Sequence, residues 1–250
     1  MTRNLKVLGL ALAAVLALGA LAASAASAQG KLTSDGPVTL TGTETEPTVA
    51  NKNALVNAIL GRVECPHSTF TGHKLTTTPH ALLPSGSTIA TVTPHYATKC
   101  TSQVPIIGAR PATVTMNGCD FEIEVGATTA ANTYKTITDL VCPPHKVIEL
   151  HIYKAGSVGH PAADTICTYT FGDESPATGA AVNQNLTGAH LTNTPASDDV
   201  DLSGSITNIH DTHEGTLCGN GTSFNNTLNI DVTINGHNSA GGATGVTVTD

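Results

Sequence analysis

The sequence predicts an all-β protein built from Ig-like, sandwich-type antiparallel sheets. Three observations predict this class. β-branched residues recur on alternate positions along most of the chain, turn residues punctuate these runs about every eight to twelve positions, and one stretch of the chain is repeated. The strands form either two related units or one pseudo-symmetric sandwich, and the sequence leaves both arrangements open.

The repeated stretch has one copy at residues 70–118 and a second at residues 186–236. Six of the ten positions in 70–79 are identical to those in 186–195. Further matches follow in the same order, with one small insertion: His95 with His213, Cys100 with Cys218, and 114–118 with 232–236. Ordered matches at a nearly constant offset are the signature of repeated structural units, so we predict an internal duplication.

The N-terminus, residues 1–28, is typical of a secretory signal peptide with a helical apolar segment. Arg3 and Lys6 precede an apolar run, and Ala26-Ser27-Ala28 forms a small-residue cleavage motif. The apolar run is short for a full membrane span. We therefore expect cleavage after Ala28, a secreted or extracellular protein, and no stable membrane insertion afterwards.

Residues 29–61 are predicted to form a polar lead-in, with an edge strand around residues 38–40. Residues 51–60 contain an apolar run that ends at Gly61, which favours a short helix. A strand is the competing interpretation, because a short apolar run fits either structure.

The remaining chain divides into a first β unit (62–171), a loose small-residue connection (172–181) and a second β unit (182–250). The runs that predict strands include 88–93, 112–116, 121–125, 147–153, 165–171, 205–209 and 227–234. Asn117-Gly118 and Asn235-Gly236 lie at or near the ends of alternating runs, and each predicts a β-hairpin turn.

Six cysteines follow the predicted cleavage site, and an even number in an exported chain indicates disulfide bonds. Counting alone does not choose among the possible pairings. The matched copies suggest equivalent bridges Cys65–Cys100 and Cys167–Cys218, which leaves Cys119 to pair with Cys142. No Cys-x-x-Cys motif occurs, and we predict no metal or cofactor site that uses these cysteines.

The composition restricts the core and the partners. Trp is absent and the chain has only four Phe and four Tyr, so the core must come mainly from Val, Ile, Leu and Ala. Burial of each larger aliphatic side chain contributes about 1.5–3 kcal/mol. The formal net charge of −8 repels phosphate backbones, which argues against a nucleic-acid partner.

Two groups of residues have some features of a metal site. Asp199 and Asp201, with Asp198 beside them, match the first half of an EF-hand loop, but the position of the bidentate Glu holds His210. His210, Asp211, His213 and Glu214 form the densest histidine cluster. They lack the helical spacing of a zinc hydrolase. We therefore favour a solvated strand edge for the first group and exposed or capping histidines for the second.

Two further groups have some features of a catalytic site. Cys65-Pro66-His67 and Cys142-Pro143-Pro144-His145 would suit a Cys–His nucleophile only if the cysteines were free, and export argues against this. Glu122 and Glu124 would share one strand face, but their alternation with apolar residues indicates an ordinary solvent-facing strand. We assign no catalytic residue.

The run from Thr113 to Phe121, followed by Val141-Cys142-Pro143 and the strand around Cys167, resembles exported, cysteine-containing, β-rich proteins of high-GC Gram-positive bacteria. This resemblance implies no activity, ligand or functional residue.

The first functional hypothesis is a secreted, disulfide-stabilised, non-catalytic β protein that acts by surface contact with an envelope or extracellular partner. The alternatives are a small extracellular hydrolase or carbohydrate-active enzyme, and a calcium-dependent binding module. Gathering of His210, Asp211, His213 and Glu214 in one concave pocket would favour the hydrolase. Scattering of these residues over exposed strand ends would favour the first hypothesis.

Overall fold

The structure is a computed structural model that describes residues 31–34, 38–44, 54–57, 61–66, 68–74, 88–96, 100–105, 107–172, 185–194 and 196–249. The predicted signal peptide lies outside these residues. The described chain is almost entirely antiparallel strand, with no α-helix, so the predicted all-β class is confirmed. No helix long and apolar enough to span a membrane occurs in this part of the chain.

The first nine strands are β1 (Lys31–Ser34), β2 (Thr39–Glu44), β3 (Ala54–Asn57), β4 (Gly61–Glu64), β5 (Thr69–Lys74), β6 (Thr88–His95), β7 (Cys100–Val104), β8 (Gly108–Thr115) and β9 (Asp120–Ala130). The remaining strands are β10 (Thr133–Val141), β11 (Ile148–Tyr153), β12 (Thr165–Phe171), β13 (Asn185–Thr194), β14 (Asp199–Glu214), β15 (Gly221–His237), β16 (Ala243–Thr244) and β17 (Val246–Thr249), with a single 3-10 turn, η1 (Ala162–Asp164), before β12.

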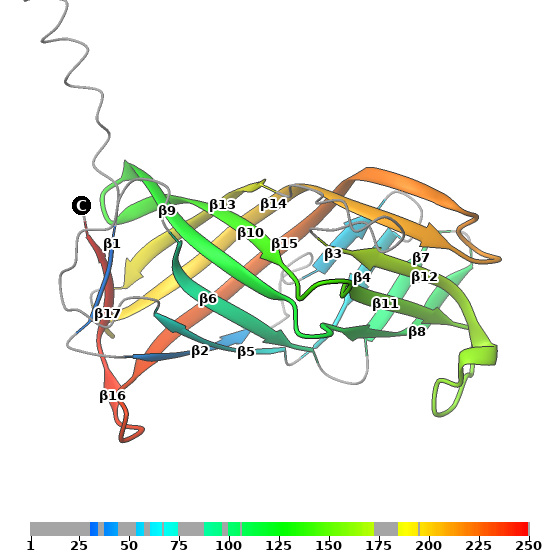
Figure 1. The fold of residues 1–250 in the computed structure, drawn as a ribbon, viewed down its shortest axis with the longest axis horizontal. Coiled ribbons are helices and arrows are strands. Elements are labelled where there is room, and N and C mark those ends of the chain that lie inside the picture. The colour runs from blue at the N-terminus through cyan, green and yellow to red at the C-terminus, as the bar shows by residue number, and fades with distance from the viewer. Residues whose placement is uncertain are drawn as a thin grey trace, which may run out of the picture.

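Most of these strands belong to one antiparallel sheet that closes on itself twice (Figure 1). β14 and β15, of 16 and 17 residues, pair along their length and form a ribbon that both closures share. The first ring runs β15-β2-β5-β6-β9-β10-β13-β14, and the second runs β14-β12-β11-β8-β7-β4-β3-β15. Opposite walls of each ring face one another across a core, as the two sheets of a sandwich do. Closure also pairs the strand edges that would otherwise be exposed.

Strand alternation explains why these residues build closed walls, because successive side chains point to opposite faces. On β2, for example, Leu40 is buried while Thr39 is exposed. On β14 the buried residues are even-numbered up to Ile206 and odd-numbered from Ile209, and the register shifts between these two residues. This bulge lets one strand keep its apolar side toward the interior of both rings.

A separate two-stranded sheet, β1 with β17, packs at the end of the first ring where the chain terminates (Figure 1). Leu32, Val246 and Val248 are buried there and join the main core. The Asn193 side chain holds this small sheet in place. Its Nδ2 donates to the Val248 carbonyl at 2.6 Å, and its Oδ1 accepts from the Val248 N–H at 2.7 Å.

The cysteines form the three pairs that the matched copies suggested: Cys65–Cys100, Cys119–Cys142 and Cys167–Cys218. Cys119 lies where the chain passes from β8 in the second ring to β9 in the first, and Cys142 lies where it passes back from β10 to β11. This bridge therefore ties together two crossings between the rings. Cys65–Cys100 joins the end of β4 to β7, both in the second ring. Cys167–Cys218 joins β12 to the turn that follows β14.

The short helix predicted within residues 51–60 is wrong for residues 54–57, which are the part of this segment that the structure describes. Residues 54–57 form β3, which pairs with β15 on one side and with β4 on the other. These residues form a strand because they pair with other strands of the sheet. A short apolar run in the sequence gives no sign of such pairing. The lead-in also contains β2, which is bounded by β15 and β5 and is not an edge strand.

Both Asn-Gly pairs differ from the hairpins predicted for them. Asn117 and Gly118 have φ of 52° and 84°, as a tight turn of this type requires, and the Cys119 N–H donates to the Met116 carbonyl at 2.8 Å. However, the strands on either side, β8 and β9, belong to different rings and do not pair. Asn235 and Gly236 lie within β15 and pair with β2.

Both copies of the predicted duplication open with two consecutive strands that pair antiparallel, β5–β6 and β13–β14. A Cβ at either matched glycine, Gly72 or Gly188, would lie within about 2.2 Å of a carbonyl oxygen on the partner strand. The last matched blocks differ in structure. Residues 114–118 cover the end of β8 and the turn after it, whereas residues 232–236 lie within β15. The duplication and the division at 172–181 stay predictions, and strands from both predicted units contribute to each ring.

Candidate binding surface

The outer face of four neighbouring strands in the first ring carries a regular set of polar side chains that includes no Asp, Glu, Lys or Arg. The set, which we call the polar face, contains only Thr, Asn and His: Thr39, Thr41, Thr69, Thr71, His73, Thr91, Thr93, His95, Thr233, Asn235 and His237. The alternate positions on the same strands point inward and include Leu40, Phe70, Val92 and Ile234, all buried. Burial of that apolar set fixes which side chains face outward.

The polar face is ordered in rows because its strands pair in register. One row runs Asn235, Thr41, Thr71, Thr93 across β15, β2, β5 and β6. The row beside it runs His237, Thr39, His73, Thr91. Adjacent strands in such a sheet are about 4.8 Å apart, and alternate residues along a strand are about 6.8 Å apart. Hydroxyl, amide and imidazole groups are thus repeated at two fixed spacings.

Hydrogen bonds orient several of these groups. Thr41 Oγ1 lies 2.9 Å from His237 Nε2, and Thr71 Oγ1 lies 2.6 Å from His95 Nε2. Five side chains of the polar face are exposed: Thr39, Thr69, Thr71, His73 and His95. An extended partner could therefore contact several rows at once.

Carboxylates adjoin the polar face on β9 and β10. Glu122 pairs across the strands with Thr91 on one side and with Asp139 on the other. Burial raises the pKa of Glu124, with Asp139 and Glu122 adding to the shift, and burial together with Glu122 raises the pKa of Asp139. Glu122 and Glu124 are half-buried on this negatively charged margin.

Of the aspartates in the EF-hand-like segment, Asp201 has side-chain hydrogen-bond partners in the structure. Asp198 lies in the turn before β14, where its φ is 56°. Asp201 Oδ2 accepts from Thr194 Oγ1 at 3.0 Å, and its Oδ1 accepts from Thr233 Oγ1 at 2.8 Å. Where the structure describes the chain, no group of three or more His, Cys, Asp or Glu residues is placed to hold a metal ion.

The histidine cluster is divided by the wall of the second ring. Asp211 is fully buried, and His213 Nδ1 lies 3.4 Å from its Oδ1. The Tyr169 ring stacks on His213 with 5.2 Å between centroids, and burial together with Asp211 raises the pKa of the Tyr169 hydroxyl. Glu214, in contrast, is exposed. Glu214 therefore does not join Asp211 and His213 in one concave pocket. The prediction of exposed or capping histidines is wrong for His213, whose side chain is 8% exposed.

The Cys-Pro-His segments hold no free thiol. Cys65 and Cys142 are both oxidised, and no free cysteine is present. A thiolate nucleophile therefore has no source in the described chain.

Sequence reasoning missed the polar face as a unit. Its signal was present as Thr at alternate positions in three separate segments, at 39 and 41, 69 and 71, and 91 and 93. Joining them required the register between strands, which depends on non-local pairing. Comparisons with protein-family models, with curated proteins and with solved structures find no match to this chain.

Proposed function

We propose that this disulfide-stabilised β protein is exported and acts without catalysis, by surface contact in the cell envelope or the extracellular space. Its polar face would bind a neutral, hydroxyl-rich polymer, that is, a polysaccharide. Three disulfide bonds support an oxidising compartment outside the cytoplasm. The resemblance to exported proteins of high-GC Gram-positive bacteria supports the same location.

The observation that carries this proposal is the in-register array of Thr, Asn and His donors and acceptors on β15, β2, β5 and β6. Hydroxyl groups of a sugar chain can both donate to and accept from Thr hydroxyls, and a repeating polymer can use several rows at once. Each such hydrogen bond contributes only about 0.5–1.5 kcal/mol net. Useful affinity therefore requires many of them together, which the array allows.

Charge supports a neutral partner over an anionic one. The polar face contains no Lys or Arg and is bordered by Glu122, Glu124 and Asp139. Such a border repels phosphate and carboxylate polymers.

The test is co-sedimentation of the oxidised protein with suspended particles of three neutral polysaccharides, cellulose, chitin and starch. The variant Thr41→Val/Thr71→Val/Thr93→Val removes three hydroxyls from one row and keeps β-branched side chains, which suit strands. We expect it to bind the preferred polymer at least tenfold more weakly than the parent does. The matched control, Thr113→Val/Thr168→Val/Thr170→Val, alters three strand threonines of the second ring and should bind as the parent does. The proposal fails if the parent binds none of the three polymers, or if both triple variants lose affinity equally.

A further inference from the structure

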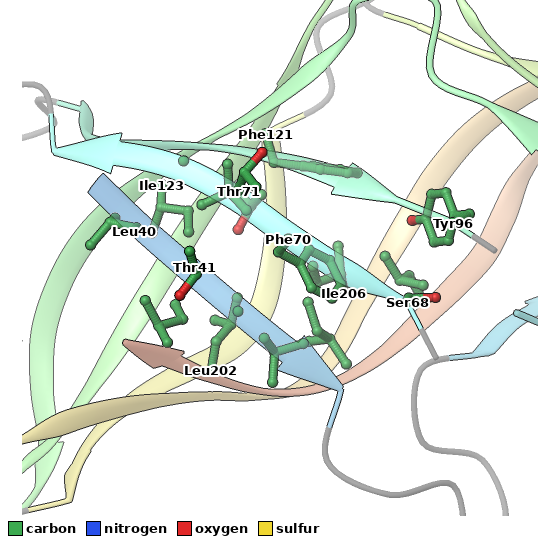
Figure 2. A pocket seen from close by; sticks show the side chains of 18 of the residues that line it. Leu40, Thr41, Ser68, Phe70, Thr71, Tyr96, Phe121, Ile123, Leu202 and Ile206 are labelled. Carbon is green, nitrogen blue, oxygen red and sulfur yellow. The ribbon is translucent and has the colours of Figure 1, made fainter. Parts of the chain in front are cut away.

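The walls of the first ring close on a filled interior. Its chamber, of about 40 Å³, is bordered by side chains that include Leu40, Phe70 and Ile206 (Figure 2). This volume is well below that of the apolar cavity of about 150 Å³ that accepts benzene in a protein core. A backbone segment in this wall therefore has little room to change its conformation.

Three Asn-Gly pairs occur in the chain, and the fold holds two of them firmly. Asn235-Gly236 lies within the wall of the first ring, where Gly236 is buried and pairs with Leu40 on one side and with Thr244 on the other. Asn117-Gly118 forms the tight turn after β8, and the Asn117 side-chain Nδ2 donates to the Val147 carbonyl at 2.9 Å.

The third pair, Asn220-Gly221, lies at the end of the β14–β15 ribbon. Residues 215–220 form the turn between these two strands, at the end of the second ring far from the C-terminus (Figure 1). Asn220 and Gly221 are both exposed, and Gly221 is the first residue of β15, where it pairs with His213. The end of such a ladder opens more readily than its middle.

An Asn-Gly pair can react with itself, because the backbone nitrogen of the glycine can attack the side-chain amide carbon of the asparagine. Glycine permits this approach, since it has no Cβ that restricts the backbone or hinders the attack. The backbone must leave its paired conformation for the two atoms to meet. Pairing on both sides of the strand, or a hydrogen bond that holds the asparagine amide, therefore slows the reaction.

We infer that Asn220 is a site of spontaneous deamidation, and that the fold protects Asn117 and Asn235 from the same reaction. The Gly221 nitrogen forms a bond to Asn220 Cγ, and the side-chain amino group leaves as ammonia together with the proton from that nitrogen. Water then opens the cyclic imide and leaves aspartate or isoaspartate at position 220. The reaction requires only water, and its product adds one negative charge to the turn.

Deamidation changes the turn that closes the shared ribbon. Isoaspartate places an extra methylene in the main chain just before Gly221, so the pairing of Gly221 with His213 is disturbed. The change stays local, because Cys218 lies just before Asn220 and is bonded to Cys167 on β12. The polar face belongs to the other ring. Deamidation therefore loosens the end of the ribbon and leaves the polar face unaltered.

The first experiment is incubation of the full oxidised protein at pH 8, followed by peptide mapping with mass spectrometry and enzymatic labelling of isoaspartate. Asn220 should deamidate at least tenfold faster than Asn117 and Asn235. In the reduced, urea-denatured protein the three rates should become similar, because each site then presents the same unpaired dipeptide. Equal rates in the folded protein, or a tenfold difference that persists after denaturation, would overturn the inference.

The second experiment measures the effect on the ribbon by hydrogen exchange before and after the same incubation. Amide exchange at residues 221–223 should become faster in the parent. Asn220→Gln is the matched control, because glutamine forms its cyclic imide much more slowly, and its exchange should not change. Unchanged exchange in the deamidated parent, or an equal increase in both proteins, would contradict the effect on the ribbon.

Discussion

Two tyrosines of the second ring differ in whether their buried hydroxyls have partners. The Tyr169 hydroxyl is buried without a hydrogen bond, whereas Tyr153 Oη lies 2.9 Å from Thr113 Oγ1. Tyr169→Phe should therefore raise the free energy of unfolding by about 1–3 kcal/mol, because it removes an unsatisfied buried group. Chemical denaturation measures this change.

Tyr153→Phe is the matched control for this prediction. It removes a hydroxyl that has a partner and should lower the free energy of unfolding by about 0.5–1.5 kcal/mol. Equal destabilisation by Tyr169→Phe and Tyr153→Phe would show that the Tyr169 hydroxyl makes a hydrogen bond, which would contradict this prediction.

At the scale of residues, the sequence predicted the cysteine pairs but not the buried polar groups. The pairs followed from the repeat, because Cys100 and Cys218 occupy matched positions in the two copies. One cysteine lies just upstream of each copy, Cys65 before the first and Cys167 before the second. Burial of Asp211 was not predictable in this way. The side of the wall that it faces depends on the bulge between Ile206 and Ile209, and no sequence pattern marks that bulge.

At the scale of elements, burial of carboxyl groups, together with repulsion between them, makes the β9–β10 pair sensitive to pH. The pKa values of Glu124 and Asp139 are raised above their ordinary values of 4.5 and 3.8. A carboxyl group whose pKa is raised in the folded protein contributes stability that is fully present below its unfolded pKa. This contribution is lost as the pH rises through its folded pKa. Glu122→Gln should therefore stabilise the protein at pH 7 by about 0.2–1 kcal/mol, the usual cost of opposed like charges.

The same comparison at pH 3.5 tests the cause. The benefit of Glu122→Gln should become smaller there, because the raised pKa values of Glu124 and Asp139 mean that these two neighbours lose their charge as the pH falls. Glu214→Gln, at an exposed position on β14, should change stability at neither pH. A benefit of Glu122→Gln that is equally large at pH 3.5 would contradict an electrostatic origin.

The Asn193 side chain gives a second prediction at this scale. Its two hydrogen bonds to the Val248 backbone hold β17 against the first ring. Asn193→Ala should lower the free energy of unfolding by about 1–3 kcal/mol and increase amide exchange in β1 and β17. Hydrogen-exchange mass spectrometry of peptides that cover 31–34 and 246–249 measures the local effect, and unchanged exchange there would contradict it.

Alternation predicted several of the strands that have one buried face, but it did not predict β5, β7 or β13. The runs at 88–93, 121–125 and 147–153 correspond to β6, β9 and β11. Prediction failed for β3, whose short apolar run fits a helix equally well until its pairing with β15 is known. It failed again at Asn117-Gly118, because turn chemistry specifies the local backbone and not which strand the chain pairs with next.

At the scale of the whole molecule, the double closure was not readable from the sequence. It requires β15 to pair with β2 at one end and with β3 at the other, and it requires β14 to pair with β13 and then with β12. These pairings join segments far apart in the chain. The polar face depends on the same pairings, which is why its rows could not be assembled from the separate segments.

The disulfides are distributed unevenly between the rings. All three lie in the second ring or at its junction with the first, and they close loops of 35, 23 and 51 residues. Each should contribute about 3–4 kcal/mol through loss of unfolded-chain entropy. Reduction should therefore increase amide exchange in β4, β7, β8, β11 and β12 more than in β5, β6 and β13. Equal loss of protection in both rings would contradict this distribution.

The most direct test of the double ring is hydrogen exchange along the shared ribbon of the oxidised protein. Amides of β14 and β15 should be protected along both strands, from Val200 to His213 and from Gly221 to Ile234, because each half pairs within a closed ring. If one half of the ribbon exchanges as rapidly as an unpaired chain, the two rings do not share these strands and the account is wrong.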